Sequence, residues 1–415
     1  MDDPESRSDP PPSLLSGEPA IPTSFVEFVG LMALLMALTA LSIDIMLPAL
    51  PQIGEFFRLS DPNDRQLVVT SYMIGFAVGQ LLFGPLSDRF GRKSMLMVGL
   101  GIFVVGSLAA VMVDNFEHLF FARTVQGFGA ASSRVISVAV IRDLFSGWRM
   151  ARVTSLVMIV FITVPMLAPG LGQGLLYIGD WTLIFEFLLV VGIACIIWSG
   201  LRLPETHQTG QSRGSIKLGR ALRWTFTSPD TVGYSVAIGF VFGCLMAYIS
   251  SAQQIFVEVY GLGAAFPIAF GAVAGVQALA AFTNASLVQH YGMRRVSHAA
   301  LLSFCAGSLA LMAVAPFEPS LLLFATLLAI VFFSFGLIMP NFNAIAMQPV
   351  GSVAGTASSF VGFYTTAAGA LLGWLIGAYF DGTVQPLATG FACLSLAALA
   401  TVLAVERRRG LFKGE

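Results

Sequence analysis

Two residues of opposite charge lie inside apolar stretches of this sequence, where a proton-exchange site could form. Asp44 lies in the apolar segment 25–47, and Arg123 lies in the apolar segment 118–141. If both segments cross a bilayer as helices, Asp44 lies roughly 12 Å and Arg123 roughly 10 Å outside the middle of its segment. A carboxylate that exchanges its arginine partner for a proton could couple movement to a proton gradient. The alternatives are a fixed ion pair, or an Asp44 that stays hydrated at the outer rim.

A second arginine and several uncharged side chains could line an internal cavity. Arg134 follows Arg123 by about three helical turns. It could contact a ligand, pair with another helix or extend towards the cytoplasm, whereas Glu258 is expected at the outer rim. Polar residues inside membrane helices mostly bond between helices, and some of them contact ligands. The substrate-cavity candidates are Tyr72, Gln126, Arg134, Gln254, Gln277, Asn284 and Asn341.

The composition predicts the elements that must position these side chains. The chain has 415 residues, of which 56% are hydrophobic and 11% are charged. Soluble proteins average about 25% charged residues. The apolar residues come in blocks of roughly 20, the length of a helix that crosses a ~30 Å hydrocarbon core. The sequence therefore predicts an all-α membrane protein with spans at 25–47, 67–87, 95–113, 118–141, 153–177, 182–202, 232–256, 266–289, 298–316, 320–345, 354–379 and 386–405.

The basic residues predict how these spans are oriented. Of the 22 Lys and Arg residues, 18 fall between or beyond the spans on one side. Arg58 and Arg65 fall on the other side, and Arg123 and Arg134 lie within a span. Cytoplasmic loops of membrane proteins carry the excess of positive charge. We therefore expect a multi-pass protein of the cell inner (plasma) membrane with both termini in the cytoplasm.

The longest polar connection divides the chain into two groups of six spans. Tyr291-Gly292-Met293-Arg294-Arg295, after the eighth span, repeats the position of Phe90-Gly91-Arg92-Lys93 after the second, but it lacks an acid equivalent to Asp88. Two parallel repeats with a central site are a common transporter architecture. The expected domains are a disordered cytoplasmic tail at 1–24, a six-helix bundle at 25–202, a cytoplasmic linker at 203–231, a second bundle at 232–405 and a basic tail at 406–415.

A short charged loop joins the second and third spans. It reads Gly84-Pro85-Leu86-Ser87-Asp88-Arg89-Phe90-Gly91-Arg92-Lys93. Gly84 would let a neighbouring helix come close, and an acid followed by three cations suits ion pairing and docking at helix ends. For the single cations, a loop that only fixes the topology is the alternative. The whole string resembles the G-x-L-x-D-R-x-G-R-R/K signature of the major facilitator superfamily, which comprises twelve-helix secondary transporters.

Three other segments resemble motifs of the drug:proton antiporters within that superfamily. Residues 42–51 resemble the first-helix Asp-x-x-x-Pro element, and residues 123–130 resemble the fourth-helix R-x-x-Q-G-x-G-A motif. Residues 168–173 resemble the fifth-helix G-P-x-x-G-G motif, from which Ala168 and Gln173 depart. The resemblance extends over 25–405 and is greatest to exporters of the bicyclomycin-resistance and chloramphenicol-resistance type.

The resemblance implies a fold of twelve transmembrane helices in two pseudo-symmetric six-helix bundles, and roles for particular residues. Asp44 and Arg123 would serve proton coupling. A charge cluster would latch the two halves on the inner side in the outward-open state, with Asp88 near the start of the eleventh span. The inner-gate residues would be Gly84, Asp88, Arg89, Gly91, Arg92, Arg142 and Asp143, and Pro165, Pro169 and Gly172 would bend the fifth span.

These features predict a proton-coupled exporter of small amphipathic or apolar drugs that works by alternating access. An importer or a metabolite exporter on the same fold is the alternative, because fold does not fix function and the fifth-helix motif is altered. A membrane enzyme or receptor would need a catalytic or metal cluster that the sequence lacks. No P-loop is present to use ATP, and a net charge of −1 argues against nucleic acid. We expect substrate, protons and lipid as partners, no cofactor or metal, and a monomer.

Overall fold

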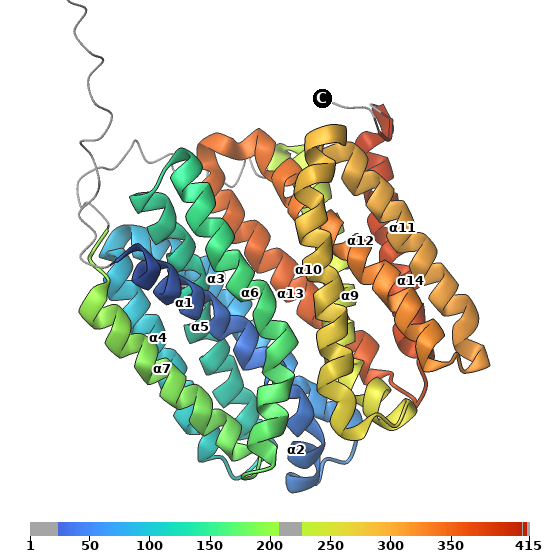
Figure 1. Ribbon diagram of the computed structural model, residues 1–415, viewed down its shortest axis with the longest axis horizontal. Helices are drawn as coiled ribbons and strands as arrows, with labels where there is room; N and C mark the ends of the chain where they lie inside the picture. Colours follow the sequence, from blue (N-terminus) through green and yellow to red (C-terminus); the bar gives the residue numbers. More distant parts are fainter. Residues whose placement is uncertain (1–23, 207–225, 409, 413–415) are drawn as a thin grey trace, which may run out of the picture.

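The computed structural model describes residues 24–206, 226–408 and 410–412 (Figure 1). Within these ranges the structure is all helical, and twelve helices are long and apolar enough to cross a bilayer. The predicted fold class is therefore confirmed. The expected tail before residue 24, most of the expected linker and the end of the basic tail lie outside the described residues. The cations among them are Arg7, Arg213, Lys217, Arg220, Arg223, Arg409 and Lys413.

Helices of the first half pack together at one side of Figure 1 and helices of the second half at the other. The first set comprises α1 (Phe25–Asp44), α2 (Leu50–Phe56), α3 (Leu67–Phe90), α4 (Arg92–Val111), α5 (Phe116–Leu144), α6 (Gly147–Leu176) and α7 (Thr182–Arg202). The second set comprises α9 (Pro229–Gln253), α10 (Phe266–Tyr291), α11 (Met293–Val314), α12 (Leu321–Met347), α13 (Ala354–Ala378) and α14 (Gln385–Val405). The two sets meet mainly through α3 against α13 and α6 against α10.

The first span is broken and longer than the sequence predicted. Helix α1 ends at Asp44, and after a turn the short 3₁₀-helix Leu47–Ala49 and then α2 continue to Phe56. Pro48 and Pro51 each lie in the first turn of one of these short helices, where their missing N–H group costs no hydrogen bond. The prolines thus end one helix and begin the next. Asp44 lies at the break.

Small residues bring the helices of the first half into backbone contact. A Cβ atom built on Gly127 of α5 would lie 1.9 Å from the carbonyl oxygen of Tyr72 in α3, and one on Gly75 of α3 would lie 1.9 Å from that of Thr124 in α5. Such positions admit only glycine and are typical of membrane helix pairs. The close packing fixes how α5 is oriented, and α5 carries both intramembrane arginines.

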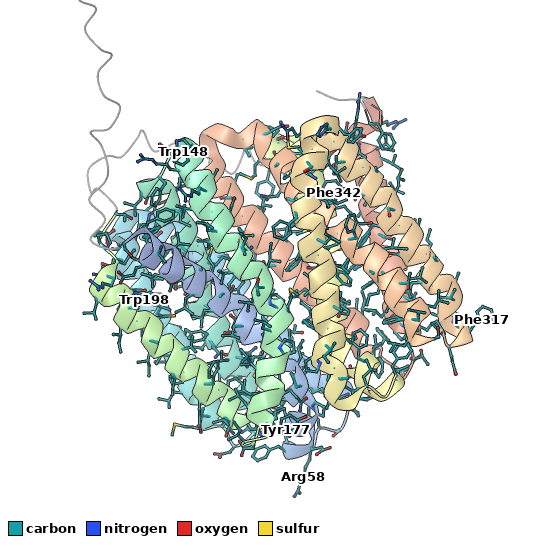
Figure 2. All side chains as sticks on the ribbon, viewed as in Figure 1. Arg58, Trp148, Tyr177, Trp198, Phe317 and Phe342 are labelled. Atoms are coloured by element: carbon teal, nitrogen blue, oxygen red, sulfur yellow. The ribbon has the colours of Figure 1, made fainter. Side chains whose placement is uncertain are left out.

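The outside of the bundle is apolar, as a lipid-facing surface requires. Val26, Leu201, Ile268 and Leu322 are each more than three-quarters exposed. In Figure 2, Trp148 and Tyr177 lie at opposite ends of the bundle, as aromatic residues at the two membrane interfaces do. Following the charge prediction, we call the end with Tyr177 and Arg58 the outer end and the end with Trp148 the inner end.

Candidate functional site

Asp44 is a buried carboxylate with no bonding partner. Its exposed fraction is 4%, and it forms no hydrogen bond or ion pair with any residue that the structure describes. It lies within electrostatic range of the hydroxyl groups of Tyr72 in α3 and Tyr248 in α9. The Tyr248 hydroxyl is also buried without a described hydrogen-bond partner. Asp44 therefore faces the boundary between the two halves.

Arg123 is fully buried, and each of its donor groups has a partner. Its Nε donates to the carbonyl oxygen of Val68 at 3.0 Å, one terminal nitrogen donates to that of Ser42 at 3.0 Å, and the other donates to Gln126 Oε1 at 2.5 Å. The guanidinium also lies over the rings of Tyr72 and Phe185, 4.5 and 5.7 Å from their centroids. The cation is thus held rigidly between α1, α3, α5 and α7.

The expected ion pair between Asp44 and Arg123 is not formed, so that prediction was wrong for this state of the protein. Arg123 binds the backbone of Ser42, two residues before Asp44 in the last turn of α1, instead of the Asp44 carboxylate. The free carbonyl groups at a helix C-terminus attract a cation. Arg123 therefore fixes the end of α1 and leaves the Asp44 carboxylate without a cation.

Helix α6 touches the break in the first span beside Asp44. A Cβ atom on Gly172 would lie 2.1 Å from the carbonyl oxygen of Ile45. Helix α6 runs through Pro165 and Pro169 as one helix, so the predicted bend at these prolines stays a prediction. Near this contact is a cavity of about 330 Å³ whose lining includes Pro48 and Gln173. Gln173 is one of the two residues that depart from the fifth-helix motif.

At the outer end, polar side chains join the two halves. Gln66 Nε2 donates to Gln254 Oε1 at 2.6 Å, and Gln254 Nε2 donates to Asn63 Oδ1 at 2.7 Å. Arg65 forms an ion pair with Glu258. Gln254 was expected in the substrate cavity but takes part in this contact, because the last turns of the seventh span form a π-helix that faces residues 62–66. Glu258, which was expected at the outer rim, is partly exposed at this end.

The same residues of the first half also bind the end of α13. Asn63 Nδ2 donates to the carbonyl oxygens of Ala378 and Phe380, and Gln66 Nε2 donates to that of Gly377. We call Asn63, Arg65, Gln66, Gln254 and Glu258 the outer closure. Asn63 and Gln66 were not predicted as site residues, although the polar run 61–66 beside a predicted span was a signal.

At the inner end, Arg92 organises a cluster of acids. It pairs with Asp88 at 2.6 Å and with Asp143 at 2.9 Å. Glu205 accepts hydrogen bonds from the backbone N–H groups of Arg92 and Lys93 at 2.8 and 3.1 Å, and so caps the start of α4 with negative charge. Sequence reasoning missed Glu205, whose only signal was its place just after the sixth span.

Other predicted inner-gate residues lie apart from Arg92. Arg89 is exposed and lies over the Phe90 ring, and Arg142 is exposed without a described bond. Gly91 has a φ of 96°, which suits the sharp turn into α4. Gly84 faces α13, where an added Cβ would lie 2.8 Å from Ser359 Oγ. The ion pair of Asp88 lies within the first half, so its role in latching the halves stays a prediction.

The second half contains a matching charge cluster. Gly292 has a φ of 82°, and Arg294 just after it is buried and pairs with Asp230 at 3.2 Å and with Glu406. The loop lacks its own acid, but α9 and the end of α14 supply two. Tyr234 donates its hydroxyl to Glu406 at 2.8 Å, and the same oxygen lies 2.8 Å from His298 Nε2. This cluster was not predicted from the sequence.

The remaining substrate-cavity candidates divide into bonded and unbonded side chains. Tyr72 and Gln126 do not line a cavity, because both are fully buried against Arg123, and Gln126 also donates to Ser107 at 2.7 Å. The side chains of Asn341 and Asn284 bond to each other at 2.7 Å, joining α12 to α10. Gln277 and Arg134 keep partly exposed side chains with no described hydrogen bond or ion pair: Gln277 is half-buried and Arg134 is exposed.

The chain is similar to known membrane transporters both in its sequence and in its structure. Residues 32–373 match the family model described as Major Facilitator Superfamily. A bicyclomycin resistance protein homolog of Haemophilus influenzae is 29% identical over 92% of this chain and 96% of its own length. The multidrug resistance protein MdtL of Klebsiella pneumoniae subsp. pneumoniae is 24% identical over 80% of this chain and 84% of its own length. A crystal structure of a D-xylose-proton symporter has a TM-score of 0.73 at 13% identity, over 95% of this chain and all of that one.

Proposed function

The chain belongs to the Major Facilitator Superfamily, and from that premise we propose that it is a proton-coupled secondary transporter that exports small amphipathic or apolar drugs by alternating access. The names of two relatives, a bicyclomycin resistance protein homolog and a multidrug resistance protein, support the export of drugs. The observation that carries the coupling is Asp44, a buried carboxylate without a partner at a break in the first span.

Asp44 is placed to respond to a proton. An acid inside a membrane protein typically belongs to an ion or proton pathway. When Asp44 is neutral, its burial within electrostatic range of Tyr248 of the second half is tolerated. When it is charged, it needs water or a cation, and the nearest arginine, Arg123, is already bound to Ser42, Val68 and Gln126. Loss of the proton therefore favours a conformation in which the two halves separate beside Asp44.

The outer closure supports alternating access. The halves are joined at the outer end through Gln66, Gln254 and the ion pair of Arg65 with Glu258. The contact between Gly172 and Ile45 links α6, which packs on α10 of the second half, to the break beside Asp44. Rocking of one half against the other would break the outer closure and open the pathway at the outer end. The 18 cations predicted on one side support an inner-membrane protein with both termini in the cytoplasm, and we propose that it works as a monomer.

Direction and coupling can be tested together. We expect cells that express the protein to accumulate less of a drug such as chloramphenicol, and a proton uncoupler to abolish the difference. Asp44→Asn should abolish gradient-driven export while leaving exchange of drug across vesicles without a gradient intact. Asp114→Asn, an exposed acid in an outer-end loop, is the matched control. Higher drug accumulation in expressing cells would favour the alternative of an importer, and full export by Asp44→Asn would exclude Asp44 from coupling.

A further inference from the structure

We propose that Arg134 binds an anionic group of the transported compound, so that the substrates of this transporter include aromatic carboxylates. The proposal rests on the proposed function as a transporter, and it names a substrate class for the central pathway. Three properties of Arg134 carry it: the side of α5 on which it lies, its lack of an acid partner and the aromatic ring beside it.

The first property is the side of α5 on which Arg134 lies. Phe121 and Val125, near the outer end of α5, are 64% and 40% exposed and lie on one face of the helix. Arg134 follows Val125 by nine residues, which is about two and a half turns and places it on the opposite face. Arg123, which is buried between α1, α3 and α7, lies on the same face as Arg134, because eleven residues are about three full turns. This face is buried at Arg123 but open further towards the inner end of α5, where Arg134 and, one turn on, Val138 are both exposed.

The second property is the uncompensated charge of Arg134. It forms no hydrogen bond or ion pair with any described residue. Two buried arginines at the inner end are, by contrast, neutralised by acids: Arg92 by Asp88 and Asp143, and Arg294 by Asp230 and Glu406. A charge inside a membrane protein is costly unless it is paired or hydrated. The guanidinium of Arg134 therefore keeps its planar set of N–H donors available, and their geometry matches that of a carboxylate.

The third property is the aromatic ring next to the guanidinium. Arg134 lies over the ring of Phe161 in α6, with its central carbon 5.3 Å from the ring centroid. This cation–π contact orients the guanidinium without using its hydrogen-bond donors. A ligand with a ring and a carboxylate can pack against Phe161 while its anionic group binds Arg134. Because Asp44 is not within described bonding distance of Arg134, proton and anion would occupy separate positions.

The test compares two dyes that share a xanthene ring and differ in charge. Carboxyfluorescein is anionic and rhodamine 123 is cationic near neutral pH. Binding to the purified full-length protein is measured by fluorescence anisotropy at constant pH, and transport is measured in everted vesicles with a proton gradient. We expect Arg134→Gln to weaken carboxyfluorescein binding on the order of tenfold, as loss of a charge-assisted bond does. Rhodamine 123 binding should stay the same or improve. Arg134→Lys, which keeps the charge, should retain part of the carboxyfluorescein affinity.

The control variant is Arg58→Gln, which removes an arginine that points away from the bundle at the outer end (Figure 2). It should bind both dyes like the unmodified protein. Unchanged carboxyfluorescein binding in Arg134→Gln would overturn the proposal, as would an equal loss of both dyes or a failure of the unmodified protein to bind carboxyfluorescein. If the unmodified protein binds carboxyfluorescein through Arg134 but the gradient moves neither dye, the anion site stands and the proposed proton-coupled export fails.

Discussion

Gly172 of α6 lies directly against the backbone of Ile45, so closely that a Cβ atom on Gly172 would be 2.1 Å from the Ile45 carbonyl oxygen. Ile45 follows Asp44 at the break in the first span. Helix α6 in turn packs on α10 of the second half. A shift of the backbone at Asp44 would therefore press on α6 through Ile45, and α6 contacts the second half through α10.

The first prediction concerns this contact. Gly172→Ala should push α6 away from the first span, because the neighbouring atom is backbone and cannot rotate aside. We expect gradient-driven transport to fall on the order of tenfold and stability to fall by about 1–3 kcal/mol, as in overpacked cores. Transport in vesicles and thermal unfolding in detergent measure the two effects. Gly174→Ala, two residues on in the same helix with no atom within 4 Å of its Cβ position, should behave like the unmodified protein, and equal behaviour of both variants would refute the argument.

The second prediction concerns Arg123. Arg123→Lys keeps the charge, but a single ammonium group cannot reproduce the planar donors that bind Ser42, Val68 and Gln126 together. We expect a severe transport defect, on the order of 100-fold for the loss of two charge-assisted hydrogen bonds. Initial rates of drug transport in proteoliposomes provide the measurement. Arg202→Lys, at a half-exposed ion pair with Glu27, is the control, and near-normal transport in Arg123→Lys would show that charge alone is sufficient.

The third prediction concerns the outer closure. Gln254→Ala removes the amide that bonds to both Asn63 and Gln66, so the outward-open state should become more populated. Spin labels at positions 58 and 317, both at the outer end, should then give a longer mean distance in pulsed electron resonance. The exposed Cys393 is replaced by Ser in all samples. Gln385→Ala, an exposed outer-end glutamine, should leave the distance unchanged, and an identical distribution in Gln254→Ala would show that this amide does not hold the closed state.

The fourth prediction concerns the charge cluster of the second half. Glu406 is 2% exposed and accepts bonds from Arg294 and Tyr234. Glu406→Gln leaves Asp230 as the only described acid that pairs with Arg294, and removing one charged partner of a buried pair costs about 3–5 kcal/mol. The melting temperature in detergent should therefore drop clearly. Glu55→Gln, an exposed acid of α2, should change stability by less than about 0.5 kcal/mol; a similar melting temperature for both variants would mean that Glu406 is not needed for folding.

The helices could be predicted from the sequence, whereas the direction of the side chains could not. Apolar blocks located the spans because their length is set by the bilayer. The depth of Asp44 and Arg123 along their spans indicated a pair, but depth does not determine which way a side chain points. Arg123 instead donates hydrogen bonds to the carbonyl oxygen of Ser42 and to Gln126. The ends of the first and seventh spans were also hard to place, because prolines and a π-helix extend helical backbone past the apolar blocks.

Partners far apart in the sequence were the other source of error. Gln66 and Gln254 are separated by 188 residues, and Glu406 lies 112 residues from Arg294. No local pattern marks such contacts in one sequence. They follow only when the two halves are placed side by side.

The outer closure is made mostly of carboxamide groups. Amides do not ionise across the range of acidity that the outer face of a cell membrane meets, and their short bonds are little affected by dissolved ions. Only the contact between Arg65 and Glu258 in this set is ionic. The outer closure should therefore be about equally stable at acidic and neutral pH and at high salt. Asp44 would then be the group whose protonation responds to the proton gradient.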